Sequence, residues 1–192
     1  MNTLLIGLHG LARTGKDTAA AYLASHFALY SYAFADPIKA AIAQLFSLTG
    51  KHIEGSLKET LLPGIGKSPR QLMQLLGTEW GREQVHPELW LLLAQQNIAN
   101  QLEVDQTHYN GVVIRDVRFE NEAEWIRRQG GHVVHILRPE AQAVAAHSSE
   151  SGIGIHDNDL VVHNDGSLDD LYRQLDRVMC AVAAAHRQRP AA

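Results

Sequence analysis

Short apolar runs recur along the chain and alternate with longer segments of helical spacing. Five runs, at residues 4–8, 30–34, 112–114, 132–137 and 160–162, predict short strands buried in a sheet. The segments between them repeat apolar side chains every three or four positions, which indicates amphipathic helices. This order predicts an α/β fold: a doubly wound, mainly parallel five-stranded sheet with right-handed crossovers and helices on both faces.

Proline and short polar side chains mark where several of the helices begin. Asp36-Pro37 is expected to supply the cap and first residue of one helix, and Ser68-Pro69 those of another. Gly77 is expected to end or bend the second of these helices. A further helix is predicted from Pro87 to about Leu102.

Capping boxes indicate two more helix starts. Ser56 and Glu59 have the spacing of such a box, which predicts a short helix, and Ser167 with Asp170 predicts the start of the last helix. The whole chain is expected to form one domain with a mobile polar flap and a frayed end. The expected bounds are 1–186 for the domain, 140–158 for the flap and 187–192 for a flexible tail.

A glycine-rich loop, Gly10-Leu11-Ala12-Arg13-Thr14-Gly15-Lys16-Asp17-Thr18, lies between the first strand and the first helix. Strand, loop and helix together form the context of a G-x-x-x-x-G-K phosphate-binding loop. Gly10 and Gly15 permit the tight turn that brings backbone N–H groups against phosphate oxygens, and the helix N-terminus adds unpaired donors. Lys16 carries a cation to the outer phosphates and Arg13 can add a second. The sequence therefore predicts a nucleoside triphosphate site here.

Asp17 stands where the usual motif has the Ser or Thr that holds Mg²⁺. A bare carboxylate would repel phosphate, but it is tolerable if Mg²⁺ lies between them, because that ion prefers oxygen ligands. Thr18 can still bond an inner phosphate. Alternatively, Asp17 only favours the helix start through its charge, which is worth about 0.3–1 kcal/mol.

Further polar side chains follow the predicted strands, and ligands of such sheets bind beyond the carboxyl ends of the strands. They are Lys39, Arg115 to Arg118, Arg138 and Asn164-Asp165, and with the glycine-rich loop we expect them to converge on one edge. Guanidinium groups bind phosphate oxygens in pairs, so two clusters of arginine suggest two phosphorylated ligands and phosphoryl transfer between them. Asp116 is the expected carboxylate to hold Mg²⁺ through water or to orient the acceptor.

Several of the charged residues have a plainer interpretation. Arg115 and Arg118 lie three positions apart and need not both face the site, and we favour Arg118. Lys39 and Arg70 could each contact an anion or be solvated. His147, in the flap beside Glu150, could contact a substrate. Solvated helix charges are expected at Arg127, Arg128 and Arg173.

Composition narrows the class of protein. The chain has 192 residues, 45% of them hydrophobic, which is enough to bury a core. Its net charge is −4, and because nonspecific nucleic-acid binding usually needs a basic domain, such binding is not expected. The single cysteine, Cys180, excludes an internal disulfide, fits the reducing cytoplasm and is expected to be a small core residue. No charged leader and no apolar run near 18 residues is present, so neither a signal peptide nor a membrane span is expected.

Eleven histidines raise the question of a structural metal site. His132 and His135 fall on opposite faces of one strand, and the chain has no C-x-x-C motif. We therefore expect no structural zinc.

Taken in order, the motifs resemble those of the phage-type deoxynucleotide monophosphate kinases, within the P-loop nucleotide kinases. The similarity includes the Lys-Asp-Thr that closes the glycine-rich loop. No later piece is specific alone, but the ordered set covers nearly the whole chain. Those later pieces are 35–39, 70–78, 116–118, 138–139, 147–152 and 159–168.

This resemblance implies transfer of the ATP γ-phosphate to a deoxynucleoside 5′-monophosphate (dNMP), giving a dNDP and ADP, with Mg²⁺ as cofactor. It implies that Lys16 and Arg13 neutralise the transferring phosphate, that Asn164 lies near the donor adenine, and that the flap is a lid which excludes water. The helices between 36 and 102 would carry most of the acceptor site. Its expected members are Lys39, Arg70, Gln74, Arg118, Arg138, His147 and Glu150.

Two alternatives stay open at this point. A kinase of the same architecture could use another acceptor, such as phosphomevalonate or dephospho-coenzyme A, and the region around Trp125 also resembles the phosphomevalonate kinases of animals. A nucleotide-dependent switch is the other, although the chain has neither an Asn-Lys-x-Asp nor an Asp-x-x-Gly motif.

We expect a cytoplasmic protein, in the host if it is phage-encoded, and the sequence does not decide between a monomer and a homodimer. The chain looks shorter than some relatives between Lys51 and Pro69, which leaves its base preference open.

Overall fold

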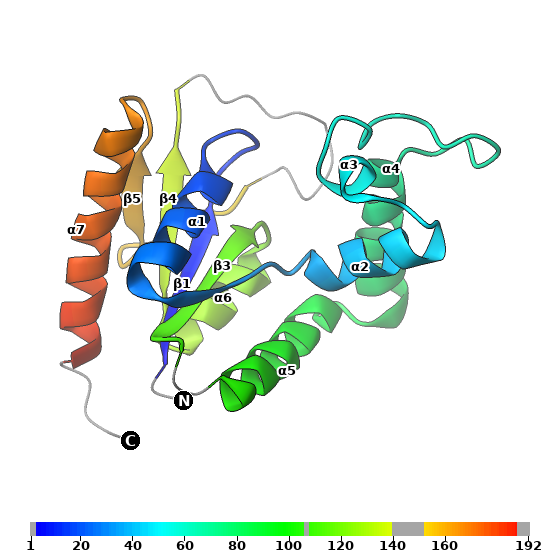
Figure 1. Ribbon diagram of the computed structural model, residues 1–192. Helices are drawn as coiled ribbons and strands as arrows, with labels where there is room; N and C mark the ends of the chain where they lie inside the picture. The colour runs from blue at the N-terminus through cyan, green and yellow to red at the C-terminus, as the bar shows by residue number, and fades with distance from the viewer. Residues whose placement is uncertain (1–2, 106–107, 140–151, 188–192) are drawn as a thin grey trace. The chain divides into compact units, whose positions relative to one another are not determined.

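The computed structural model describes residues 3–105, 108–139 and 152–187 (Figure 1). The chain divides into two compact units, one formed by residues 1–33 and 98–192 and the other by residues 34–97. Of the predicted flap, residues 140–151 lie outside the described part, and so do residues 188–192 of the predicted tail. No helix in the described ranges is both long and apolar enough to cross a bilayer.

A five-stranded sheet forms the centre of the first unit. Its strands pair in the order β2-β3-β1-β4-β5, and every pair is parallel. This arrangement confirms the predicted sheet. The strands are β1 (Leu4–His9), β2 (Leu29–Tyr32), β3 (Gly111–Val117), β4 (His132–Leu137) and β5 (Leu160–His163).

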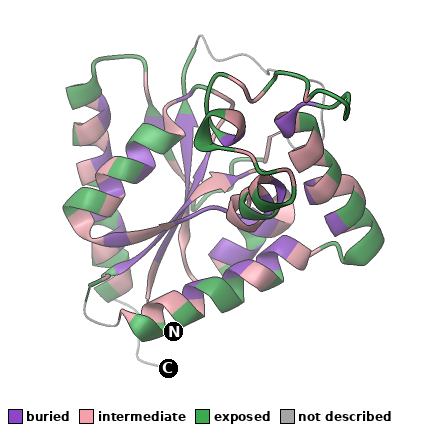
Figure 2. Ribbon diagram, turned by 45° about the vertical axis from the view of Figure 1, so that its right-hand side comes forward, coloured by how far each residue is buried: buried purple, intermediate pink, exposed green. Residues whose placement is uncertain are grey.

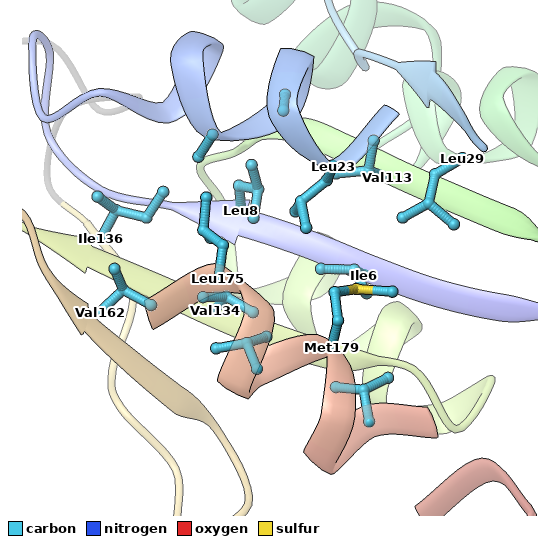
Figure 3. Close-up of a cluster of buried hydrophobic side chains, with 14 of the residues drawn as sticks. Ile6, Leu8, Leu23, Leu29, Val113, Val134, Ile136, Val162, Leu175 and Met179 are labelled. Atoms are coloured by element: carbon cyan, nitrogen blue, oxygen red, sulfur yellow. The ribbon is translucent and has the colours of Figure 1, made fainter. Parts of the chain in front are cut away.

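Helices cover both faces of this sheet, as predicted. On one face, α1 (Lys16–Phe27) and α7 (Leu168–Arg187) share a core with alternate residues of β1, such as Ile6 and Leu8 (Figure 3). On the other face, α6 (Glu120–Arg128) approaches so closely that a Cβ on Gly7 would meet Ile126 Cδ1. Glycine at position 7 therefore permits this approach without a shift of the Ile126 side chain. Figure 2 shows the strands largely buried between these helices.

Strand β3 is longer than predicted and irregular at its carboxyl end. Its register against β1 runs from Gly7 opposite Ile114 to His9 opposite Val117, so β3 carries one extra residue. Arg115 and Asp116, predicted to follow the strand, instead lie within this bulged end. Bulges of this kind re-aim side chains and often lie beside functional sites.

The last helix begins as predicted, and one of its residues is exposed where burial was expected. Ser167 Oγ accepts from Asp170 N, and Asp170 Oδ2 accepts from Ser167 N, which completes the capping box. The prediction that Cys180 is a core residue was wrong, because this cysteine is exposed. The buried stripe of α7 runs through Leu171, Leu175, Val178, Met179 and Val182, and position 180 falls outside it.

The second unit is helical. It contains α2 (Asp36–Leu45), α3 (Gly50–Ile53), α4 (Pro69–Gln74), the π-helix η1 (Leu75–Val85) and the first part of α5 (Leu89–Val104), within which the division of the chain falls. Ser68 caps α4 as predicted, since its Oγ accepts from Gln71 N. Asp36 is not a cap, because α2 begins at that residue and Ala35 precedes it.

One further prediction in this unit was wrong. No helix forms at Ser56 to Glu59, where the chain makes turns, and the capping side chain is Thr49, at the start of α3. Gly77 was expected to end or bend its helix; the helix does not end there but continues as η1, a π-helix that begins two residues before Gly77. Trp90 packs against this segment, since its Nε1 donates to Gly77 O at 2.6 Å and its ring fills the space a side chain would need at Gly81.

Candidate nucleotide-binding site

The glycine-rich loop follows β1 directly and has the backbone conformation that its glycines permit. Gly15 has φ 97° and Arg13 has φ 65°, both in the left-handed region. A Cβ on Gly10 would lie 2.5 Å from Ile136 O and 2.7 Å from Thr14 Oγ1. Positions 10 and 15 therefore need glycine, one for space and the other for conformation.

Side chains of the loop bond back to its own carbonyl groups. Lys16 Nζ donates to Gly10 O at 2.5 Å and to Leu11 O at 2.6 Å. The buried Thr14 donates from Oγ1 to Leu11 O at 2.9 Å. These bonds hold the ammonium group at the loop, while Arg13, Asp17 and Thr18 are exposed beside it.

Asn164 supports the loop from the turn between β5 and α7. Its Nδ2 donates to Thr14 O at 2.9 Å, and its own backbone N–H is bonded to Leu137 O at the end of β4. A Cβ on Gly15 would lie 2.5 Å from Asn164 Nδ2. The structure thus brings Asn164 to the loop, as expected, and shows that its amide bonds the loop backbone.

The carboxyl end of β3 lies near the same loop. Glu122, which is buried, accepts from Arg118 N at 2.8 Å and from Phe119 N at 3.1 Å at the start of α6. Burial lowers the pKa of His9, and the positive charges of Lys16 and Arg118 lower it further. Both cations therefore oppose a positive charge on the histidine at the end of β1.

His9 is the member of this edge that sequence reasoning missed. It precedes Gly10, is 8% exposed, and its Nδ1 lies 2.9 Å from Val117 O. The available signal was a polar side chain closing an otherwise apolar strand directly before the loop.

A buried ionic cluster lies on the α6 face of the sheet. Arg127 donates to both carboxylate oxygens of Asp159, at 3.0 and 2.7 Å, and to Glu120 Oε1 at 2.7 Å. His135 Nε2 and His156 N also contact Asp159 Oδ2, at 2.9 and 3.0 Å. The prediction that Arg127 is a solvated helix charge was wrong, because α6 turns it towards a carboxylate that is 1% exposed. Arg128 and Arg173 are exposed, as predicted.

Removing the cation of this cluster should destabilise the fold. Arg127→Ala leaves Asp159 buried without its bidentate partner, so we expect the free energy of unfolding to fall by about 3 kcal/mol. Arg128→Ala is the matched control, since that side chain is 66% exposed and the expected loss is below about 0.5 kcal/mol. Urea denaturation of both variants at neutral pH measures the difference. Equal losses in the two variants would contradict this account of the cluster.

The same cluster predicts the acid side of the stability profile. Burial alone would raise the pKa of Asp159, but the bonds from Arg127, His156 N–H and His135 outweigh it and hold the pKa at about 2. The folded pKa lies below the ordinary value of 3.8, so this stabilisation is complete above that pH and is lost as the pH falls towards 2. Asp159→Asn should therefore flatten the decline of stability over this range, as urea titrations at several pH values would show. An unchanged slope would contradict the expectation.

Comparisons with known proteins bear on the whole chain. A sequence model of the family "Deoxynucleotide monophosphate kinase" matches residues 4–68 and 66–175. A protein of Acanthamoeba polyphaga mimivirus, named "Putative deoxynucleotide monophosphate kinase", is 32% identical over 90% of this chain and 94% of its own length. The chain belongs to the deoxynucleotide monophosphate kinase family.

Another member of this family is longer than this chain. The deoxynucleotide monophosphate kinase of Enterobacteria phage T4 is 27% identical, with 91% of this chain and 98% of that protein covered. That alignment spans 239 positions, more than the 192 residues here, and the two family matches meet at 66–68, within the stretch predicted to be short. Among solved structures, a dephospho-CoA kinase from Campylobacter jejuni is similar with a TM-score of 0.48 and 16% identity, covering 94% of this chain and 97% of that one.

The remaining candidate residues of this deoxynucleotide monophosphate kinase family member lie in the second unit, after β4 or outside the described residues. Lys39 Nζ pairs with Glu54 at 2.6 Å and Arg70 Nη1 with Glu59 at 3.1 Å, all within the second unit. Gln74 ends α4 in the same unit, and Arg138 is exposed after β4. His147 and Glu150 lie outside the described residues.

Proposed function

We propose that this protein transfers the γ-phosphoryl group of ATP to a deoxynucleoside 5′-monophosphate, giving ADP and the deoxynucleoside diphosphate. The observation that carries the proposal is the match to the deoxynucleotide monophosphate kinase family across residues 4–175, which includes the phosphate-binding loop. We also propose a cytoplasmic location, because the single cysteine cannot form an internal disulfide and this suits a reducing compartment.

We assign the donor triphosphate to the glycine-rich loop. Its backbone N–H groups and the N-terminus of α1 suit phosphate oxygens, and Lys16 supplies the cation nearest the outer phosphates. Arg13, exposed and in the left-handed conformation, can reach the transferring group. Asn164 holds the Thr14 carbonyl, and the family resemblance implies that the donor adenine lies near this side chain.

Asp17 and Asp116 are the side chains we propose to hold Mg²⁺, directly or through water. The described ranges contain no cluster of three or more acidic, histidine or cysteine side chains that could enclose a metal alone. Mg²⁺ is commonly held by one or two carboxylates together with several waters and the substrate phosphates, so one or two aspartates are enough for this role. When bound, the ion would neutralise charge on the phosphate oxygens.

From the family resemblance we assign the acceptor monophosphate to Arg118, Arg70 and Lys39. The further predicted members of that site remain Gln74, Arg138, His147 and Glu150. In the structure, Lys39 and Arg70 hold glutamates that are 61% and 65% exposed. Ion pairs with such exposed partners are worth about 1 kcal/mol or less, so an incoming phosphate can displace the glutamates.

In the proposed chemical step the phosphoryl group passes directly between the two substrates, and the protein forms no covalent bond to it. An anionic oxygen of the acceptor phosphate attacks the γ-phosphorus, and the bond from that phosphorus to the bridging oxygen breaks, releasing ADP. The attacking oxygen is already ionised near neutral pH, so no general base is required. Positioning and charge neutralisation by Lys16, Arg13 and Arg118 are then the expected contributions.

An acceptor panel tests the proposal. ADP release from Mg-ATP would be measured with dTMP, dGMP, dCMP and dAMP, with the matching ribonucleotides, and with phosphomevalonate and dephospho-coenzyme A. We expect strong stimulation by at least one deoxynucleotide. Stimulation only by one of the last two compounds, or hydrolysis unaffected by every acceptor, would contradict it.

A further inference from the structure

His9 is a buried histidine that the proposed mechanism does not use. It is the last residue of β1, lies edge-on to the ring of His135 with centroids 5.1 Å apart, and is followed directly by Gly10. A polar ring enclosed at this point needs partners for both of its nitrogens.

The contacts of the ring define its tautomer. A carbonyl oxygen can only accept, so Nδ1 must carry the hydrogen that bonds Val117 O at 2.9 Å. Nε2 is then an acceptor, and Ile153 N–H donates to it at 3.5 Å. Both bonds together require the neutral ring protonated at Nδ1.

The groups that face the ring favour the same neutral form. Lys16 from α1, Arg118 beyond β3 and His135 from β4 each oppose a positive charge on His9. His135 is in turn bonded to the carboxylate of Asp159, which pairs with Arg127.

The hydrogen bond from His9 to Val117 O acts on the backbone of Arg118 as well as on the end of β3. Val117 O and Arg118 N belong to the same planar peptide unit, and Glu122 accepts from that N–H at 2.8 Å. The two side chains therefore hold this peptide from opposite ends. The bulge in β3 interrupts the regular ladder here, so side chains take over the positioning.

We propose that His9 is a positioning residue that, together with Glu122, sets the Arg118 peptide relative to the phosphate-binding loop. The inference rests on the proposed function for the assignment of Arg118 to the acceptor phosphate. Because His9 immediately precedes Gly10, one side chain joins the start of the donor loop to the residue that meets the acceptor.

Two substitutions of His9 distinguish the roles of its two ring nitrogens, Nδ1 and Nε2. The amide of His9→Asn reaches the place of Nδ1 and can still donate to Val117 O, whereas that of His9→Gln reaches the place of Nε2 and cannot. We expect His9→Gln to raise the KM for the dNMP about three- to tenfold, as one lost hydrogen bond would, with the KM for ATP changed less than about twofold. His9→Asn should restore the dNMP KM to within about twofold of the wild type.

Hydrogen exchange of the free protein gives a readout that needs no activity. We expect the Arg118 amide to exchange faster in His9→Gln than in the wild type, and His9→Asn to restore its protection. Equal behaviour of the two variants, in exchange or in the dNMP KM, would overturn the inference. A wild-type protein without dNMP-stimulated turnover would defeat the proposed function, while the exchange comparison would still judge the role of His9.

A measurement on the unaltered protein covers the case in which the variants do not fold. Ring ¹⁵N spectra of the histidines, connected to the backbone assignment, report which nitrogen of His9 is protonated. The Nδ1–H tautomer at neutral pH is the result expected. The Nε2–H tautomer would overturn the inference.

Discussion

Lys16→Ala should lower kcat for phosphoryl transfer about a hundred- to a thousandfold, because it removes a preorganised cation from the developing charge on the phosphate oxygens. The ammonium group donates to the carbonyls of Gly10 and Leu11 in its own loop. We therefore expect the free energy of unfolding to change by less than about 1 kcal/mol.

Steady-state ADP release and urea denaturation, on the same protein preparations, measure the two effects of Lys16→Ala. Lys67→Ala is the matched control, because Lys67 is an exposed lysine outside the glycine-rich loop. Turnover within a few-fold of the wild type in Lys16→Ala would contradict the assignment of this loop to the donor phosphates. A comparable loss in Lys67→Ala would show that the effect does not depend on the loop.

Arg118→Ala should reduce kcat/KM for the dNMP about a hundredfold, because a guanidinium can make two charge-assisted bonds to one phosphate. The backbone bond from Arg118 N to Glu122 survives the substitution, so the start of α6 should remain intact. The KM for ATP is expected to stay within about threefold of the wild type, since donor and acceptor phosphates are assigned to different groups.

Initial rates with each substrate varied in turn distinguish the two parameters for Arg118→Ala. Arg173→Ala is a suitable control, because Arg173 is 67% exposed and pairs with Asp170 on its own helix. A weakened ATP interaction with an unchanged dNMP KM would show that Arg118 belongs to the donor side.

The parts of the fold that the sequence predicted are those encoded locally. The buried strands are short apolar runs, and the cap at Ser68 and the loop from Gly10 to Thr18 depend on neighbouring residues. The order of polar side chains after the strands also placed Asn164 beside the loop correctly, because parallel strands share one carboxyl edge.

The remaining features depend on contacts between distant residues. Arg127 meets Asp159 across 32 positions of sequence, and His9 meets Val117 across 108, so neither pair has a local signature. The extra residue in β3 is a property of its register with β1. The error at Cys180 has a local cause instead. The helical stripe through Val178 and Val182 already excludes position 180, but the prediction relied on the usual burial of cysteine.

Transfer of label from γ-³²P-ATP to a dNMP tests the central claim most directly. The protein would be incubated with Mg²⁺, labelled ATP and each dNMP, and the products separated by chromatography. Label recovered in a deoxynucleoside diphosphate, in amounts equal to the ADP formed, is the result that this account predicts. Label recovered only as inorganic phosphate, at a rate independent of the dNMP, would contradict it.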